Sequence, residues 1–158
     1  IRGIRLSLAD PSTLRTQFRA ILRVSNDRNV RILLPMVTTP SEVRKTKRVL
    51  VEEAKRMKRA GIKIPEDLPD VGVMIEVPGA ALAADALAQV SDFFAIGSND
   101  LTMYTLAVDR ANEHVAHLFN PLHPAVLRLM QFTTQAALRA RIPISICGEM
   151  AGDPRYTA

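Results

Sequence analysis

Five short, almost continuously hydrophobic runs constrain what this 158-residue chain can fold into. Each run is rich in Ile, Val, Leu or Phe and contains few polar residues. Continuous hydrophobicity is typical of strands that are buried on both faces, as in a parallel sheet covered by helices, whereas half-exposed strands alternate. We therefore expect parallel strands at residues 1–6, 30–35, 71–76, 93–97 and 142–147.

The segments between these runs carry the periodicity and start signals of helices. Residues 39–42 read Thr-Pro-Ser-Glu, a capping-box pattern that predicts a helix to about Ala60, with Gly61 as its C-terminal stop. The Asp-Pro pair at residues 10–11 predicts another helix start. Further helices are expected over residues 80–90 and 124–140.

Strand and helix alternate along the whole chain, which predicts an α/β architecture with right-handed crossovers, as either a barrel or an open doubly wound sheet. The sequence begins inside the first expected strand and stops at residues 153–158, soon after the fifth. We therefore expect a partial (β/α)8 TIM barrel with about five of its eight parallel strands. Residues 1–158 are accordingly interpreted as a fragment of one barrel domain.

Composition excludes several classes of protein. With 47% hydrophobic and 23% charged residues the chain is neither disordered nor fibrous. A single cysteine allows no internal disulfide, and neither a leader nor an 18-residue apolar run is present, so we expect a cytoplasmic protein that is not membrane-spanning. The net charge of +5 is not accompanied by interleaved aromatic residues, so nucleic acid is not the expected partner.

Carboxylates stand at the ends of two successive expected strands. Ligands of parallel α/β folds lie beyond the carboxyl ends of the strands. Glu76 ends one apolar run and Asp100 follows the next, so both are expected at the same rim. Two carboxylates that leave several positions to water and substrate phosphate are typical of Mg²⁺. The alternative is that Glu76 caps the helix at Pro78 and Asp100 caps the turn at Leu101.

Arginines and an asparagine suggest an anionic ligand. Arg5 lies in the first expected strand, Arg31 opens the second, and Arg110 follows the fourth. A guanidinium within an apolar strand needs an anion beside it and binds phosphate or carboxylate bidentately. Snorkelling at the rim is the alternative for Arg5 and Arg31, and pairing with Asp109 is the alternative for Arg110. Asn99 either donates to a phosphate oxygen or forms an Asx turn.

Cys147, at the end of the fifth expected strand, is either a small buried hydrophobic residue or a catalytic thiol. Gly148 beside it permits close approach of a ligand, and cationic neighbours would favour the thiolate. His114, His117 and His123 have no accompanying cysteine or carboxylate pattern, and we interpret them as surface or capping residues rather than zinc ligands.

Six blocks along the chain together resemble the C-terminal domain of the Enzyme I family. These are the phosphoenolpyruvate-protein phosphotransferases of the bacterial sugar phosphotransferase system, with their nitrogen-related and multiphosphoryl-transfer relatives. Pyruvate phosphate dikinase and phosphoenolpyruvate synthase share the barrel, but residues 104–110 and 122–127 look closer to Enzyme I. The blocks are residues 2–6 (RGIRL), 30–36 (VRILLPM), 72–78 (GVMIEVP), 93–102 (FFAIGSNDLT), 106–110 (LAVDR) and 147–154 (CGEMAGDP).

The resemblance implies a binding site for phosphoenolpyruvate. It assigns the substrate's phosphate to Arg5, Arg31 and Arg110, with hydrogen bonds from Asn99. Arginines neutralise and align the phosphoryl group that a loose transition state transfers.

The resemblance also implies a metal and an acid. Glu76 and Asp100 would ligate Mg²⁺, and Cys147 would protonate the enolate of pyruvate as the phosphoryl group leaves. The phosphoryl acceptor in this family is a histidine of a separate N-terminal domain, whose motif none of the three histidines here matches.

The implied partners are phosphoenolpyruvate and pyruvate, the phosphocarrier protein HPr or its nitrogen-related counterpart, and a second copy of the chain in a homodimer. We therefore expect a phosphotransferase whose fragment is inactive alone. The alternatives are a dimerisation or scaffold unit without chemistry of its own, and a relative of pyruvate phosphate dikinase or phosphoenolpyruvate synthase.

Overall fold

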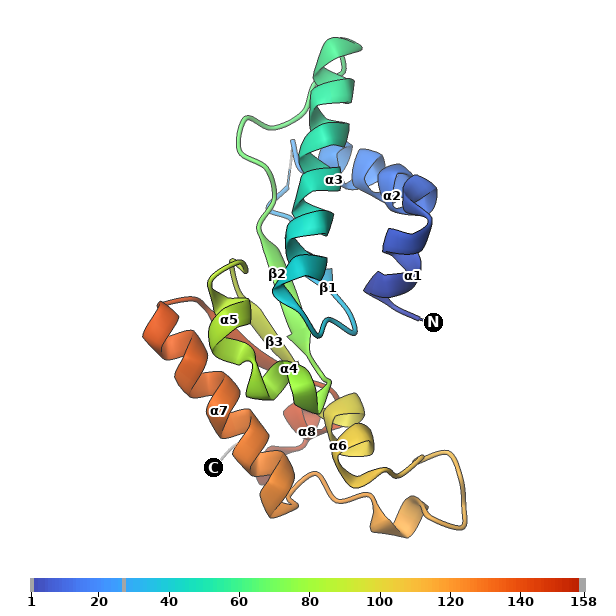
Figure 1. Ribbon diagram of the computed structural model, residues 1–158, viewed down its shortest axis with the longest axis vertical. Coiled ribbons are helices and arrows are strands. Elements are labelled where there is room, and N and C mark those ends of the chain that lie inside the picture. Colours follow the sequence, from blue (N-terminus) through green and yellow to red (C-terminus); the bar gives the residue numbers. More distant parts are fainter. Residues whose placement is uncertain (1, 27, 157–158) are drawn as a thin grey trace.

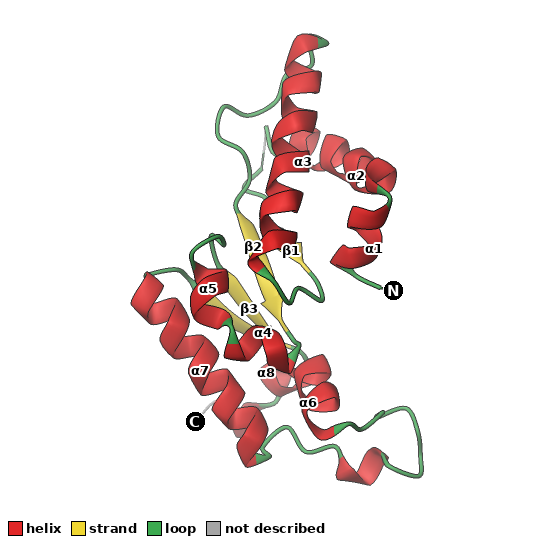
Figure 2. Ribbon diagram, viewed as in Figure 1, coloured by secondary structure: helices red, strands yellow, loops and turns green. Residues whose placement is uncertain are grey.

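The computed structural model describes residues 2–26 and 28–156 and contains a parallel sheet with helices packed against it (Figures 1 and 2). The four strands in this part of the chain are all parallel and lie in the order of the sequence. Their bounds are β1 Ile32–Leu34, β2 Val71–Ile75, β3 Phe94–Gly97 and β4 Ile144–Cys147.

The helices are α1 Ile4–Ala9, α2 Pro11–Val24, α3 Pro40–Arg59, α4 Pro78–Leu82, α5 Ala84–Ala88, α6 Ser98–Leu106, α7 Pro124–Ala140 and α8 Glu149–Gly152. Short 3₁₀ turns lie at Ala116–Leu118 and Pro154–Tyr156. The α/β class and four of the expected strands are thus confirmed. The helix expected over residues 80–90 is two short helices, α4 and α5.

The strand expected at residues 1–6 is wrong over residues 2–6, because α1 begins at Ile4, while residue 1 lies outside the described residues. Ile4 is buried and Leu8 packs against the same core, a spacing of four residues that belongs to a helix. Leu6, which a buried strand would enclose, is exposed. The amide of Ile4 donates to the Pro35 carbonyl oxygen, so α1 begins beside the chain that leaves β1.

The strand pairing shows which residues share each face of the sheet. Val73 pairs with Phe94, and Ile75 pairs with Ile96. These side chains form the hydrophobic core together with residues of α2, α3, α4, α5 and α7. Because side chains alternate along a strand, Met74, Gly97 and Cys147 belong to the opposite face. The helices therefore cover one face and leave the other available to a site.

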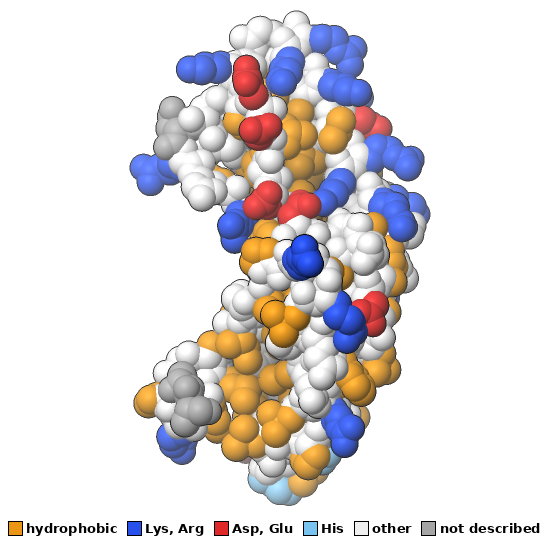
Figure 3. Space-filling model, turned by 90° about the vertical axis from the view of Figure 1, so that its left-hand side faces the viewer, with side chains coloured by type: hydrophobic (Ala, Val, Ile, Leu, Met, Phe, Trp, Pro, Cys, Tyr) orange, Lys and Arg blue, Asp and Glu red, His pale blue; other side chains and the backbone are white. Residues whose placement is uncertain are grey.

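The surface also divides. In Figure 3, charged side chains spread over the upper half of the visible face and hydrophobic side chains gather over the lower half. The long helix α7 exposes Leu127, Phe132 and Leu138. Within the described residues, no helix is both long and apolar enough to cross a membrane.

The predicted helix boundaries of α3 are confirmed. The Thr39 hydroxyl accepts from the Glu42 amide, and the Glu42 carboxylate accepts from the Thr39 amide, which completes a capping box. Gly61 follows the helix with a φ of +71°. The predicted limits of α7, residues 124–140, also match, and His123 caps this helix by accepting from the Ala125 amide.

Thr39→Ala should loosen the first turn of α3. Loss of an N-cap hydroxyl costs about 1 kcal/mol, which corresponds to amide hydrogen exchange about fivefold faster in that turn. Exchange measured by mass spectrometry over residues 38–46 tests this expectation. Thr39→Ser, which keeps the hydroxyl, should exchange as the native chain does; equal acceleration in both variants would contradict the capping argument.

Candidate functional site

The carboxyl ends of β2, β3 and β4 meet at one rim and carry polar side chains. Glu76 follows β2, Asn99 and Asp100 lie in the first turn of α6 directly after β3, and Cys147 ends β4. The parallel register places these four residues at one edge of the sheet.

Glu76 is a buried carboxylate, with 6% of the residue exposed. Its Oε1 accepts from the Met36 amide at 2.8 Å, which links the ends of β1 and β2. No side chain caps α4, whose N-cap is Val77, so the alternative role of Glu76 as a helix cap is wrong. One hydrogen bond leaves most of the acceptor capacity of this carboxylate for another group.

Asp100 is the neighbour that completes an acidic pair. Burial raises the pKa of Glu76, and the negative charge of Asp100 raises it further. Arg2 offsets part of this repulsion, with its guanidinium 3.8 Å from Asp100 Oδ1. The described residues contain no cluster of three or more His, Cys, Asp or Glu side chains suited to a metal. A pair of close carboxylates fits Mg²⁺, which keeps water and phosphate ligands, better than a closed zinc site.

Gly97 permits this close approach. It lies in β3 between Glu76 and Cys147, and it pairs with Cys147 in the sheet. A Cβ at this position would lie 2.9 Å from both Cβ and Oε2 of Glu76 and 3.1 Å from Met74 Sδ. A side chain here would displace the Glu76 carboxylate, so the site requires glycine at this position.

Cys147 is a partly buried free thiol. Its Sγ lies 3.3 Å from the Ile96 carbonyl oxygen and 3.5 Å from Met74 Sδ. Burial raises the pKa of the thiol, and the negative charge of Glu76 raises it further. The pKa of Cys147 is thus raised by its neighbours and not lowered by a cation, and the environment favours a thiol that keeps its proton.

Two arginines line a cavity of about 430 Å³ beside the acidic pair. Arg5 donates to Glu42 at 2.9 Å and to the Thr38 hydroxyl. It reaches the rim from α1 and not from a strand, which corrects its predicted position. Arg2 is the residue that our sequence analysis missed. If residues 2–5 are interpreted as the start of a helix, Arg2 and Arg5 are three residues apart and lie on the same side. If they are interpreted as a strand, the two arginines point to opposite faces.

Arg110 and Asn99 connect α6 to the segment after β4. Arg110 forms an ion pair with Glu149, not with Asp109. The Asn99 Oδ1 accepts from the Glu149 amide at 3.3 Å. These contacts place Arg110 beside the turn that follows Cys147, while the amide group of Asn99 keeps its donors for a ligand.

Arg31 does not reach this rim. It precedes β1, and its guanidinium lies 3.5 Å from Asp70 and over the Phe93 ring at 5.4 Å. Both neighbours precede their own strands, so Arg31 lies at the amino edge of the sheet. The predicted role of Arg31 at the site is wrong because parallel strands hold their two ends on opposite edges.

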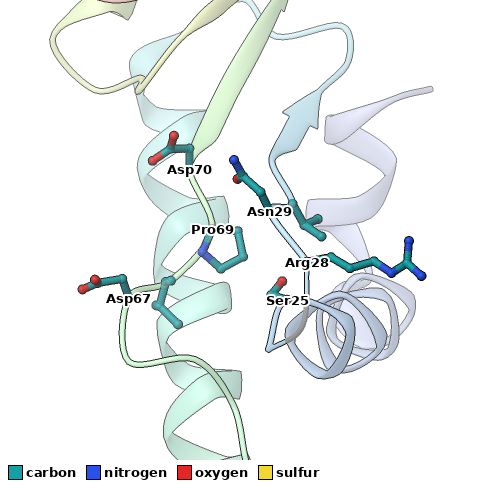
Figure 4. A pocket seen from close by; sticks show the side chains of 8 residues that line it. Ser25, Arg28, Asn29, Asp67, Pro69 and Asp70 are labelled. Atoms are coloured by element: carbon teal, nitrogen blue, oxygen red, sulfur yellow. The ribbon is translucent and has the colours of Figure 1, made fainter.

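The amino edge has a hollow of its own, of about 250 Å³, shown in Figure 4. Ser25, Asn29 and Pro69 line it between the loops that enter β1 and β2. Arg28 and Asp67 also line it, and in the same view their side chains lie on opposite sides. Charged side chains line this hollow as well, but Glu76, Asp100 and Cys147 lie at the carboxyl edge of the sheet.

Comparison with known sequences gives a match over the whole chain. Residues 1–158 match the family model of the PEP-utilising enzyme, PEP-binding domain. The phosphoenolpyruvate-protein phosphotransferase of Priestia megaterium is 45% identical over 96% of this chain and 26% of its own length. That of Cupriavidus necator is 45% identical over 99% of this chain and 27% of its own length. The chain thus spans about a quarter of the relatives that it matches.

Comparison with solved structures identifies the architecture. A citrate lyase from Burkholderia xenovorans superimposes with a TM-score of 0.64 at 18% identity, over 90% of this chain and 44% of that one. An HpcH/HpaI aldolase/citrate lyase family protein from Burkholderia cenocepacia gives a TM-score of 0.56 at 18% identity, over 78% of this chain and 52% of that one. These neighbours share a TIM-barrel-like fold, so the four parallel strands form part of a barrel.

Glu76→Gln should stabilise the protein at neutral pH in the absence of metal. Because the folded-state pKa of Glu76 is raised, the folded protein binds this proton more tightly than the unfolded chain does, and stability falls as pH rises from the ordinary glutamate pKa through the raised value. The melting temperature in EDTA should rise by roughly 2–4 °C at pH 8, and the gain should shrink on acidification.

The exposed Glu113→Gln serves as the matched charge control and should leave the melting temperature unchanged. A Glu76→Gln chain that melts below the native chain at pH 8 would show that this carboxylate stabilises the fold in its charged form.

Proposed function

The chain belongs to the PEP-utilising enzymes through their PEP-binding domain, and we propose that it supplies the phosphoenolpyruvate site of a phosphoenolpyruvate-protein phosphotransferase. The observation that carries the proposal is the meeting of Glu76, Asp100 and Cys147 with arginines at one rim. That rim combines the charges that a small phosphorylated carboxylate requires.

The arginines bind the anionic groups of the substrate. Arg2 and Arg5 line the cavity, and Arg110 reaches the rim beside Glu149. A guanidinium presents a planar set of donors that matches phosphate or carboxylate oxygens. Arg110 pairs with Glu149 in the substrate-free chain, and the substrate phosphate would replace that carboxylate. Asn99 adds side-chain donors at the start of α6.

Glu76 and Asp100 would hold Mg²⁺. When bound, the ion neutralises charge on the phosphate and on the enolate oxygen of the substrate. Burial and the negative charge of Asp100 raise the pKa of Glu76, and a bound cation would relieve this repulsion. Because Gly97 has no side chain, the carboxylate of Glu76 can lie close to β3.

Cys147 supplies a proton. Cleavage of the bond between phosphorus and the enol oxygen transfers the phosphoryl group to an acceptor nitrogen and leaves the enolate of pyruvate. The Cys147 thiol then donates its proton to C3 of the enolate, which yields the methyl group of pyruvate and a thiolate. A raised pKa suits this role, because the thiol is protonated at neutral pH before the reaction.

The remaining partners belong to the longer protein. We assign the phosphoryl acceptor to a histidine outside this chain, and the next recipient to the phosphocarrier HPr or its nitrogen-related counterpart, in the cytoplasm. The exposed hydrophobic residues of α7 favour the second proposed role, which is homodimerisation of the same protein. The high identity to phosphotransferases favours this reaction over that of a dikinase or synthase.

Arg110→Ala in the full-length protein should lower kcat/KM for phosphoenolpyruvate by about 100-fold or more, as expected for loss of a charged group that stabilises the transferring phosphoryl. Radiolabel transfer from phosphoenolpyruvate to the protein measures this value. Glu149→Gln removes the ion pair but keeps the guanidinium, and Arg139→Ala removes an arginine that pairs with Asp85 away from the cavity. Both controls should stay within about threefold of native activity. A loss in Glu149→Gln equal to that in Arg110→Ala would show that Arg110 acts through its ion pair with Glu149 and not by binding the substrate.

Asp100→Asn should abolish stabilisation by the ion. We expect Mg²⁺ to raise the melting temperature of the native full-length protein and to leave that of Asp100→Asn unchanged, because one carboxylate then remains at the site. Asp85→Asn, on the outer helix α5, is the control and should respond as the native protein does. An equal shift in all three proteins would place the ion elsewhere.

A further inference from the structure

We propose that Ser98 is a positioning residue, which fixes the acid-bearing Cys147 through the carbonyl group of that residue. The inference deepens the proposed function and rests on it for its catalytic consequence. Ser98 is almost completely buried, with 1% of the residue exposed, and its hydroxyl donates to the Cys147 carbonyl oxygen at 2.8 Å.

This bond continues the pairing of β3 with β4 past the end of both strands. The last pair in the sheet is Gly97 with Cys147, after which the two chains diverge into α6 and α8. The Ser98 side chain bridges them at the point of divergence. Ser98 and Cys147 are 49 residues apart in sequence, so the contact links the start of α6 to the end of β4.

The next residue, Gly148, is packed directly against Ser98. Its φ is +97°, and a Cβ on it would lie 2.4 Å from the Ser98 Oγ and 3.2 Å from the Asn99 Oδ1. The Glu149 amide donates to the same Asn99 oxygen at 3.3 Å. The turn after Cys147 is therefore held from one side by two successive side chains of α6.

The thiol has no comparably strong contact of its own. Its distances of 3.3 Å to the Ile96 carbonyl oxygen and 3.5 Å to Met74 Sδ are weak sulfur interactions. The position of Sγ therefore depends on the backbone of Cys147, which is held by the sheet pairing with Gly97 and, at its carbonyl group, by the Ser98 hydrogen bond. Loss of the bond should release the thiol while the arginines and carboxylates keep their own contacts.

The first measurement requires no catalysis. In the full-length protein, alkylation of Cys147 by iodoacetamide is followed by peptide mass spectrometry for the native protein, Ser98→Ala and Ser98→Thr. We expect alkylation about fivefold faster in Ser98→Ala and restored in Ser98→Thr, which keeps the hydroxyl. Ser91→Ala removes another buried serine hydroxyl that donates to a backbone carbonyl, that of Leu87, and should leave the rate unchanged.

Gly148→Ala tests the same contact from the other side, and it decides the matter should Ser98→Ala not fold. The added Cβ pushes the turn away from Ser98, so alkylation should again accelerate. Native alkylation rates in whichever of the two variants fold would overturn the proposal, as would accelerated alkylation in Ser98→Thr equal to that in Ser98→Ala.

The second measurement follows exchange of the pyruvate methyl hydrogens with solvent deuterium by NMR, in the presence of Mg²⁺. Misplacement of a catalytic group by about 1 Å costs up to about 100-fold in rate, so Ser98→Ala should exchange 10- to 100-fold more slowly while KM for pyruvate stays within about threefold. Ser98→Thr should recover the rate. Faster alkylation with unchanged exchange would overturn the catalytic consequence of Ser98. A native protein that exchanges no hydrogens would instead refute the proposed role of Cys147 and leave the alkylation result to decide the anchoring.

Discussion

The parallel pairing of β2, β3 and β4 is the constraint on which the rest of the structure depends. It brings three carboxyl ends to one rim and fixes which side chains face each other there. Gly97, in the middle strand, leaves room for Glu76 on one side and pairs with Cys147 on the other. A shift of one residue in either register would turn these side chains to the helix-covered face and disperse the site.

The rim brings together charged groups that are each costly to bury alone and that partly offset one another. A buried carboxylate at Glu76 beside Asp100 is electrostatically costly, and the raised pKa expresses that cost. Arg2 provides partial compensation, and a bound cation would provide more. The negative charge of Glu76 also raises the pKa of Cys147, so the proposed metal site and the proposed acid are electrostatically coupled through Glu76. Such coupling is characteristic of sites that trade stability for function.

Much of the fold was predictable because local signals were strong. Continuous hydrophobic runs located all four observed strands, and the capping box at Thr39 located the start of α3. The apolar run at residues 1–6 led to a wrong strand prediction. In so short a segment, Ile4 and Leu6 have the alternation of a strand, whereas Ile4 and Leu8 have the spacing of the helix that the chain forms. The position of Arg31 could have been predicted correctly. Arg31 precedes β1, and a residue that precedes a parallel strand lies at the amino edge of the sheet.

The sequence alone determined the chemical types at the strand ends and the strand positions, because both depend on residues close together in the chain. Tertiary structure decided which of these groups meet. It brought Arg2 from α1 to Asp100, paired Arg110 with Glu149, and set the Ser98 hydroxyl on the Cys147 carbonyl. These contacts join residues that are tens of positions apart, and only the pairing of strands and the packing of helices define such distances.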